Sequence, residues 1–482
     1  MRKLTHGLIV LLLSGGLFAQ SADWIFATME TERAEFLRNL DPNGIEILSS
    51  HQNLSAVHVN PQLTLHLKTG NLHGPGFIFK PDADAAISSI LHKKAKKFNI
   101  LEFTITEDDF VNQCLGMVNE ENIGNTILML EGYVTRYHTK PSGQQAALDI
   151  KDMWQDMVTA ANREDISVEL FEHNNTPQRS VILTIPGTET PEEIVIIGGH
   201  LDSGDWIHQN VAPGADDNAS GIATLTETLR ILLAQNFRPK KTVQIMGYAA
   251  EEIGLVGSEE IAESYAQQNK NVVAVAQFDM TNYKGSTFDV AFISDAQYTS
   301  TELNLFWVEL LQHYNASGEH TITYGTSYCG YACSDHVSWD AQGYLASFPF
   351  EAAFNDSNPN VHTVNDTFAS MGNSAEHSTK FVKLALEFVI EIAKVGQMGT
   401  EDLSASALSV AVQNKELIYQ SSEIQGKFLS MVIFDASART MLEKSNLESS
   451  GVVSLKGLPN GYYVVVFRDA QGKVYTKKFL LK

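Results

Sequence analysis

The chain has 482 residues, 44% of them hydrophobic and 19% charged, which indicates a globular protein of about three domains and excludes a disordered chain. Lysine and arginine number 34 against 57 acidic residues, so the formal net charge is −23. Such a charge repels phosphate backbones and excludes nucleic acid as an expected partner. It also favours solubility in an extracellular medium.

Residues 1–22 have the features of a secretory signal peptide. Arg2 and Lys3 are basic, residues 8–13 are apolar, and the small residues Ala19 and Ala22 follow. The apolar run is too short to cross a bilayer, and no later run reaches about 18 uninterrupted apolar residues. The sequence therefore predicts an exported protein without a membrane span.

Residues 23–100 contain no cluster of catalytic residue types and are expected to be an N-terminal pro-segment. This stretch ends in the basic run HKKAKKF at 92–98. Two interpretations of the run have equal weight, a solvated helix face and the cleavage site of a pro-segment.

Residues 101–395 alternate between strand and helix patterns. The apolar, β-branched runs at 194–199, 243–250 and 272–280 are separated by helical-period stretches such as 222–235. This alternation predicts an α/β fold whose mainly parallel mixed sheet is covered by helices on both faces. Ligands of such sheets bind outside the carboxyl ends of the strands.

Residues 400–482 are predicted to form a small all-β domain. After Gly396 strands alternate without helices, Pro459-Asn460-Gly461 signals a turn, and residues 471–473 are typical of a hairpin turn between two strands.

The three cysteines are Cys114, Cys329 and Cys333. The last two, with Gly330 between them, can close a small disulfide loop if the backbone turns there, and export permits such a bond. Zinc binding by this pair is the competing interpretation, disfavoured because no second Cys/His pair stands at the right spacing. Cys114 is expected to be unpaired and buried.

Polar residues follow each predicted central strand. In GGHLDSGDW, His200 ends a strand and Asp202 follows, close enough to hold the second ring nitrogen of a metal-bound imidazole. The loop GADDNASG offers Asp216 and Asp217 before a helix. On its own this loop favours a helix cap by about two to one.

The next two strand ends also carry acids. Glu251 and Glu252 are adjacent, so burial of both requires a cation nearby, and a bend could turn one toward a metal and the other toward a water. Asp279 ends the following strand, where a lone acid is usually a cap. His362 stands in a polar loop, where a lone histidine is usually exposed.

Taken together, the candidate residues indicate a metal site, although no single one of them does. Asp217, Glu252 and Asp279 carry three negative charges, which two divalent ions and a bridging hydroxide would neutralise. Without metal, these acids with Glu251 and Asp202 would bury a prohibitive negative charge. Imidazoles with carboxylates suit zinc better than magnesium or calcium.

These motifs are similar to those of the bacterial leucyl aminopeptidase family of secreted two-zinc exopeptidases. The resemblance runs in order over about residues 105–395 and rests on GGHLDS, APGADDNASGIATLTE, AAEEIGLVGSE, QFDMTNYKG, CGYACSDH and PFEAAFNDSNPNVHT. It implies that Asp217 bridges two Zn²⁺ ions, with His200 and Asp279 completing one site and Glu252 and His362 the other.

The resemblance also assigns the remaining roles. Glu251 would be the general base and acid, Asp202 the partner of His200, and the peptide bond after Asp217 would be cis. An apolar pocket would bind the first substrate residue, with a Cys329–Cys333 disulfide in its wall. The pocket positions are Met280, Ile293, Tyr331, Phe348, Phe350, Phe354 and Val361.

Two positions depart from the family pattern, and one motif has a second interpretation. PFEAAF is equally a core strand followed by a turn. Asn218 stands where some relatives have Asp, which leaves the ligand set intact. Phe348 stands where an aliphatic residue could serve, so the size preference of the pocket is open.

The resulting hypothesis is a secreted, monomeric di-zinc aminopeptidase, made as a zymogen, that cleaves the first peptide bond of peptides or proteins with large hydrophobic, leucine-like first residues. The C-terminal strands resemble sorting domains of type IX secretion cargo, which would allow display at the cell surface. One alternative is a glutaminyl-cyclase-like acyltransferase with one zinc. The other is a binding ectodomain that has lost its ligands, against which the presence of all five ligands and Glu251 argues.

Overall fold

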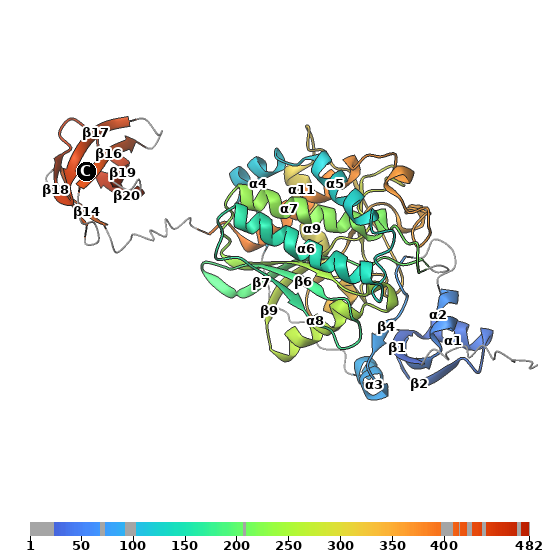
Figure 1. The fold of residues 1–482 in the computed structure, drawn as a ribbon. Helices are drawn as coiled ribbons and strands as arrows, with labels where there is room; N and C mark the ends of the chain where they lie inside the picture. The colour runs from blue at the N-terminus through green and yellow to red at the C-terminus, as the bar shows by residue number, and fades with distance from the viewer. Residues whose placement is uncertain are drawn as a thin grey trace, which may run out of the picture. The chain divides into compact units, whose positions relative to one another are not determined.

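The structure is a computed structural model that describes residues 24–67, 73–91, 103–205, 209–396, 408–413, 415–421, 427–435, 440–469 and 474–481. The predicted signal peptide, the basic run at 92–98 and the turn residues 471–473 lie outside the described residues. The chain divides into two compact units, Met1–Val395 and Gly396–Lys482 (Figure 1).

The larger unit begins with an N-terminal segment, residues 24–91, built on a four-stranded antiparallel sheet of order β2-β3-β1-β4. Ala27, Leu37, Val57 and Phe77 lie in its small core. Its elements are β1 (Ile25–Glu30), α1 (Thr31–Leu40), β2 (Ile45–His51), β3 (Leu54–Val59), α2 (Pro61–Thr64), a 3-10 turn (Leu65–Leu67), β4 (Ile78–Lys80) and α3 (Ala83–Leu91).

A six-stranded sheet of order β12-β9-β7-β8-β6-β5 is the centre of the larger unit. The neighbours β12–β9, β9–β7 and β7–β8 are parallel, whereas β8–β6 and β6–β5 are antiparallel. The predicted mainly parallel mixed sheet is therefore confirmed. The strands are β5 (Ser167–Phe171), β6 (Ser180–Ile185), β7 (Thr190–His200), β8 (Lys241–Tyr248), β9 (Asn271–Gln277) and β12 (Ala346–Ser347).

Helices cover both faces of this sheet because successive side chains of its buried strands point to opposite sides. Val195 and Ile197 of β7 join the core that contains α6, α7, α9 and α11, whereas Ile196 joins a second core with α8 and α10. In Figure 1, α6, α7 and α11 lie on one side of the strands and α8 on the other. The helices are α4 (Asp108–Leu115), α5 (Glu120–Glu131), α6 (Pro141–Ala160), α7 (Gly221–Ala234), α8 (Val256–Gln267), α9 (Thr301–Tyr314), α10 (His336–Ala341) and α11 (Glu376–Ala393).

Helix α7, which follows the predicted ligand Asp217, is buried almost all round. Its threonines tolerate this burial because their hydroxyls are paired. Thr226 Oγ1 donates to the carbonyl of Ile222 at 2.8 Å and accepts from Trp154 Nε1 at 3.0 Å. The helix is therefore a fixed support for the loop before it.

A second, three-stranded sheet of order β11-β10-β13 stands beside the central one and carries aromatic residues. Its middle strand pairs parallel with β11 and antiparallel with β13. Its strands are β10 (Val290–Ile293), β11 (Tyr324–Ser327) and β13 (Pro349–Phe350).

One buried acid in α11 has consequences for stability. Glu387 is fully buried and accepts a hydrogen bond from Asn315 Nδ2 at 2.9 Å, and burial raises its pKa to about 8. The folded state therefore favours the neutral carboxyl, a contribution that is complete below about pH 4.5 and is lost as the pH rises toward 8.

We therefore expect Glu387→Gln to be more stable than the parent protein at pH 9. Its free energy of unfolding should be higher by on the order of a few kcal/mol. The two proteins should unfold alike at pH 4. Urea titrations at both pH values measure the difference, and an equal difference at both would contradict the assignment.

The smaller unit is all-β, as predicted for the C-terminal region. Two antiparallel sheets, of order β14-β15-β18 and β17-β16-β19-β20, share one core that includes Leu417, Phe428 and Phe467. The predicted pairing across residues 471–473 is present as the β19–β20 hairpin. The strands are β14 (Leu408–Gln413), β15 (Glu416–Ser421), β16 (Lys427–Asp435), β17 (Thr440–Glu448), β18 (Ser450–Ser454), β19 (Gly461–Asp469) and β20 (Val474–Leu481).

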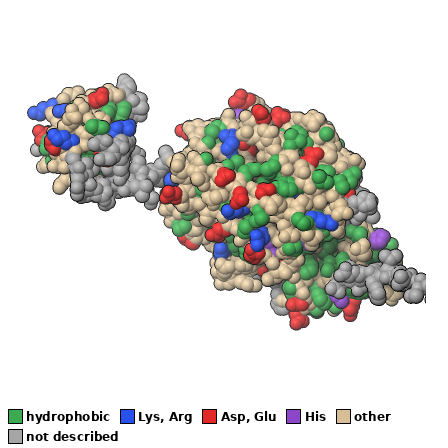
Figure 2. All heavy atoms as spheres, in the orientation of Figure 1, with side chains coloured by type: hydrophobic (Ala, Val, Ile, Leu, Met, Phe, Trp, Pro, Cys, Tyr) green, Lys and Arg blue, Asp and Glu red, His purple; other side chains and the backbone are tan. Residues whose placement is uncertain are grey.

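Among the described residues no helix combines the length and apolar character that crossing a membrane requires. On the face of the larger unit drawn in Figure 2, lysine and arginine side chains stand singly among acidic ones and form no continuous basic patch.

Candidate active site

The carboxyl ends of three neighbouring parallel strands bring the predicted ligands together. His200 is the last residue of β7, Glu252 lies in a 3-10 turn (Glu251–Ile253) after β8, and Asp279 follows β9. Asp217 comes from the loop before α7, and His362 from the loop that precedes α11. All five side chains are buried.

Asp217 stands between two groups of donor atoms. Its Oδ1 lies 3.0 Å from His200 Nε2, which is 3.3 Å from Asp279 Oδ1. Its Oδ2 lies 2.8 Å from His362 Nε2, which is 3.3 Å from Glu252 Oε2. Donors around one tetrahedral zinc are about 3.3 Å apart, given bonds of about 2.0–2.1 Å. Each oxygen of Asp217 therefore serves one potential metal site.

The chemistry of these atoms fits a cation. Among the described residues, His200 Nε2, Asp217 Oδ1 and Asp279 Oδ1 are buried and form no hydrogen bond. Asp217, Glu252 and His362 form a potential metal-binding group with donor atoms within 4.8 Å of one another. Buried polar atoms that form no hydrogen bond are costly, and a metal ion would satisfy them.

Electrostatics within the site favour ionised acids and protonated imidazoles. Burial opposes ionisation of Asp217, but the imidazoles of His362 and His200 outweigh it and hold its pKa well below the ordinary value. Burial also opposes protonation of His362, whereas the carboxylates of Glu252 and Asp217 raise its pKa to about 9. Because a metal displaces the imidazole proton, metal affinity should rise with pH.

Left-handed backbone conformations surround the ligands. Ala250 (φ 55°), Met280 (φ 53°) and His362 (φ 56°) are non-glycine residues in this sparsely populated region. The turn at Ala250 is the bend that places both Glu251 and Glu252 at the end of β8. The Asp217–Asn218 peptide bond is cis, as the resemblance implies.

Asp202 has a wider role than the sequence suggested. Its Oδ1 lies 3.4 Å from His200 Nδ1, which also lies 3.2 Å from the backbone carbonyl oxygen of Asp202. The same carboxylate also accepts hydrogen bonds from the backbone amides of Glu251, at 3.0 Å, and Glu252, at 3.2 Å. One buried acid therefore orients a ligand imidazole and the acidic turn together.

The loop of Asp217 is held by an acid that sequence reasoning missed. Asp366 accepts from the backbone amides of Asp216, at 3.0 Å, and Asp217, at 3.1 Å. The cap role considered for this loop belongs to Asn218, whose Oδ1 accepts from Gly221 N–H at 2.9 Å. The only sequence signal for Asp366 is its place four residues after His362.

Arg136 is a second residue that the sequence did not reveal. Its buried guanidinium donates to the carbonyls of Leu201 (3.0 Å), Leu130 (3.1 Å), Pro213 (2.6 Å) and Gly214 (2.8 Å). Burial lowers its pKa to about 10, so it remains a cation at neutral pH. The side chain joins the loop after His200 to the loop before Asp217.

Glu251 is the acid beside the ligands. Its Oε1 has no hydrogen-bond partner among the described residues, and burial raises its pKa well above the ordinary value. Asp335 lies in its electrostatic neighbourhood, and burial raises the pKa of Asp335 to about 7. Burial therefore makes both carboxylates stronger bases than an exposed carboxylate.

The predicted pocket residues form one apolar cluster. Phe348 and Phe350 are fully buried with ring centroids 5.2 Å apart, and Phe354 lies 5.7 Å from Phe350. The Cys329–Cys333 disulfide is present, with a Cα–Cα distance of 6.3 Å; Cys333 belongs to this cluster and Cys329 packs against it. Cys114 is free and buried, as expected. The cluster contains Met280, Ile293, Tyr331, Cys333, Phe348, Phe350 and Phe354, with Cys329 and Val361 packed against it.

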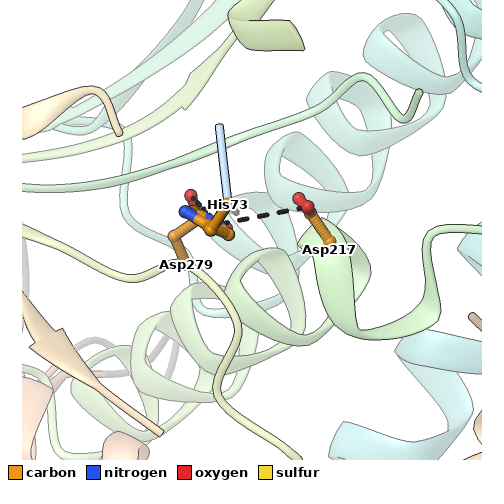
Figure 3. Close-up of side chains that lie close together, drawn as sticks. All are labelled: His73, Asp217 and Asp279. Carbon is orange, nitrogen blue, oxygen red and sulfur yellow. Dashed lines mark ion pairs between the residues drawn. The ribbon is translucent and has the colours of Figure 1, made fainter. Parts of the chain in front are cut away.

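The structure also places a residue of the N-terminal segment in the site. His73 Nε2 lies 3.3 Å from Asp279 Oδ2 and 4.0 Å from Asp217 Oδ2 (Figure 3). Sequence reasoning did not select His73, because the segment shows no cluster of catalytic residue types. Its flanking Gly74-Pro75-Gly76 was the one local sign of a specialised loop.

Comparison with known proteins identifies the family. Residues 180–387, which include all five ligand positions, match the model of peptidase family M28. A probable aminopeptidase of Saccharomyces cerevisiae is 33% identical over 298 residues, covering 60% of this chain and 77% of that protein. The chain belongs to peptidase family M28. This M28 protein is an aminopeptidase and a metallopeptidase, as the sequence predicted.

Other relatives of this M28 aminopeptidase agree. Leucine aminopeptidase 1 of Ajellomyces capsulatus is 32% identical over 294 residues, covering 59% of this chain and 74% of that protein. LapB of Legionella pneumophila has a TM-score of 0.67 at 26% identity, and the LapA aminopeptidase of the same organism 0.65 at 27%. Both alignments cover 77% of this chain and 99% of the Legionella chain.

Proposed function

We propose that this M28 aminopeptidase uses two zinc ions and removes large hydrophobic, leucine-like first residues from peptides or proteins. One ion would be held by His200, Asp217 and Asp279, the other by Asp217, Glu252 and His362. The observation that carries the proposal is that the two carboxylate oxygens of Asp217 face different imidazoles. Oδ1 lies 3.0 Å from His200 Nε2, and Oδ2 lies 2.8 Å from His362 Nε2.

The proposed reaction is hydrolysis of the first peptide bond. When bound, the two ions would polarise the scissile carbonyl and lower the pKa of the attacking water to about 7. Glu251 takes a proton from this water as the new C–O bond forms, and delivers it to the leaving nitrogen as the C–N bond breaks. A pKa raised by burial makes the Glu251 carboxylate a stronger base for the first of these transfers. Asp202 keeps the Glu251 backbone fixed meanwhile.

Substrate preference would be set by the apolar cluster beside the metal-binding residues. Met280, next to the ligand Asp279, belongs to this cluster, and so does Phe350. Each methylene buried in an apolar pocket improves the binding free energy by about 0.8 kcal/mol, so a leucine side chain would be preferred to alanine. The name of the Ajellomyces relative, leucine aminopeptidase 1, supports the same preference.

We also propose that the protein is exported. The features of residues 1–22 support this, and so does the disulfide, because such bonds persist in oxidising compartments. The substrates would then be extracellular peptides or proteins with a free amino terminus.

Metal content and substrate range test the proposal together. With residues 1–100 removed, so that His73 no longer stands in the site, we expect two zinc ions per chain and hydrolysis of leucyl-p-nitroanilide. N-acetyl-leucyl-p-nitroanilide is the matched control and should not be cleaved, because it has no free amine. One zinc per chain, with ammonia released from an N-terminal glutamine peptide and no anilide cleavage, would instead favour the cyclase alternative.

A further inference from the structure

His73 is built into the active site rather than lying near it. Its ring is 1% exposed and faces the carboxylates of Asp279 and Asp217 from the side of the N-terminal segment (Figure 3). His73, Asp217 and Asp279 together form a potential metal-binding group with donor atoms within 4.8 Å. Neither ring nitrogen of His73 forms a hydrogen bond within the described part of the chain. A buried imidazole in that state lacks a partner that a cation would supply.

The backbone around His73 is shaped to deliver the ring. The Tyr331 hydroxyl accepts from His73 N–H at 2.9 Å and donates to the His73 carbonyl. Gly74 follows at φ +70°, where an added Cβ would lie 2.4 Å from the carbonyl oxygen of Cys333. Only glycine fits this approach. Arg33, from α1 of the same N-terminal segment, places its guanidinium over the Tyr331 ring, 3.9 Å from the ring centroid.

His73 occupies the position where the proposed function places the substrate. The His73 ring stands between the acids of the first proposed metal site and the apolar cluster, 5.6 Å from the Phe350 ring and 6.2 Å from the Phe348 ring. Catalytic zinc sites keep one coordination position open for water or substrate. An imidazole at this point would fill that position and cover the entrance to the pocket.

Further contacts hold the segment in place away from His73. Lys80 forms a buried ion pair with Glu259 of α8, and the Tyr298 hydroxyl donates to Glu30. The backbone amide of Phe79 donates to the carbonyl of Gly254 at 2.9 Å, directly after the turn that carries Glu251. The segment is therefore docked on the same strand ends that form the site.

A cavity remains between the segment and the catalytic residues. It has a volume of about 650 Å³, and its lining includes Phe77 and Phe79 of the segment and Gly204 and Glu252 of the site. The cavity reaches the site at Glu252, whereas His73 is not among its lining residues.

We propose that His73 is an additional metal ligand, supplied by the N-terminal segment, that keeps the aminopeptidase latent in the full chain. This inference rests on the proposed metal site and adds its regulation. The imidazole would bind beside Asp217 and Asp279 until the segment is removed. Latency would thus depend on a metal–ligand bond as well as on coverage of the pocket.

The test uses full-length protein loaded with Co²⁺, whose visible spectrum reports its ligands. His73→Ala should change the spectrum, retain metal at least about tenfold less well against a chelator, and regain the parent spectrum with added imidazole. His66→Ala is the matched control, because His66 is an exposed histidine of the same segment. Gly74→Val is a second variant, which should displace an intact His73 and give the same spectral change. With zinc, His73→Ala should hydrolyse leucyl-p-nitroanilide at least about tenfold faster than the parent chain.

The outcomes separate this inference from the proposed function. If Co²⁺ binds but its spectrum is the same with and without His73, the residue merely pairs with the two acids and the inference is wrong. A full chain that is already as active as the protein lacking residues 1–100 would also overturn it. If neither form binds metal or cleaves leucyl-p-nitroanilide, the proposed function itself fails.

Discussion

Replacing Glu251 with glutamine is expected to reduce kcat for leucyl-p-nitroanilide by a factor on the order of 10² or more, while two metal ions per chain remain bound. The amide has nearly the shape of the carboxylate but cannot take the proton of the attacking water. Glu251 is outside the proposed ligand set, so its replacement leaves the ligand donors in place. The measurement is steady-state kinetics with metal analysis on the protein lacking residues 1–100.

A matched control is Glu319→Gln, because the Glu319 side chain is 86% exposed. It should leave both kcat and metal content unchanged. If Glu251→Gln retained full activity, another group would have to carry the proton, and Asp335, with a pKa raised to about 7 by burial, would be the next candidate.

Replacing Arg136 with methionine is expected to cost at least about 4 kcal/mol of folding free energy. Methionine keeps much of the side-chain volume but donates to none of the four carbonyls that the guanidinium now pairs. Each unpaired buried acceptor costs about 1–3 kcal/mol. The site should weaken as well, because Arg136 connects the loops that follow His200 and precede Asp217.

Urea denaturation measures this loss, and Arg179→Met provides the comparison. The Arg179 side chain is 41% exposed and pairs with Glu172 at the surface, so its replacement should change stability by less than about 0.5 kcal/mol. Equal stabilities of the two variants would show that the four Arg136 hydrogen bonds do not stabilise the fold.

The sequence predicted the parts of this protein that obey local rules. Apolar, β-branched runs became β7, β8 and β9, and ligands placed after them had to meet because parallel strands end at one edge. His362 lies in an irregular loop, where only its combination with the other candidates and the resemblance selected it.

What the sequence could not reveal depends on contacts between distant segments. Arg136 acts through carbonyls up to 78 positions away, and backbone carbonyls leave no mark on side-chain patterns. His73 meets Tyr331 across 258 positions, and its segment has no periodic pattern that directs it to the site. Burial and pairing of such residues become visible only when the tertiary structure is known.

The shared use of Asp202 limits how this enzyme can change. The same carboxylate fixes the imidazole of His200 and the amides of the Glu251–Glu252 turn. A substitution there would alter the proposed metal site and the proposed proton transfer together, so neither could be changed alone through this position. Evolution or engineering toward other metals would have to proceed through supports that serve a single ligand, such as Ser334, whose hydroxyl donates to Asp279 at 2.6 Å.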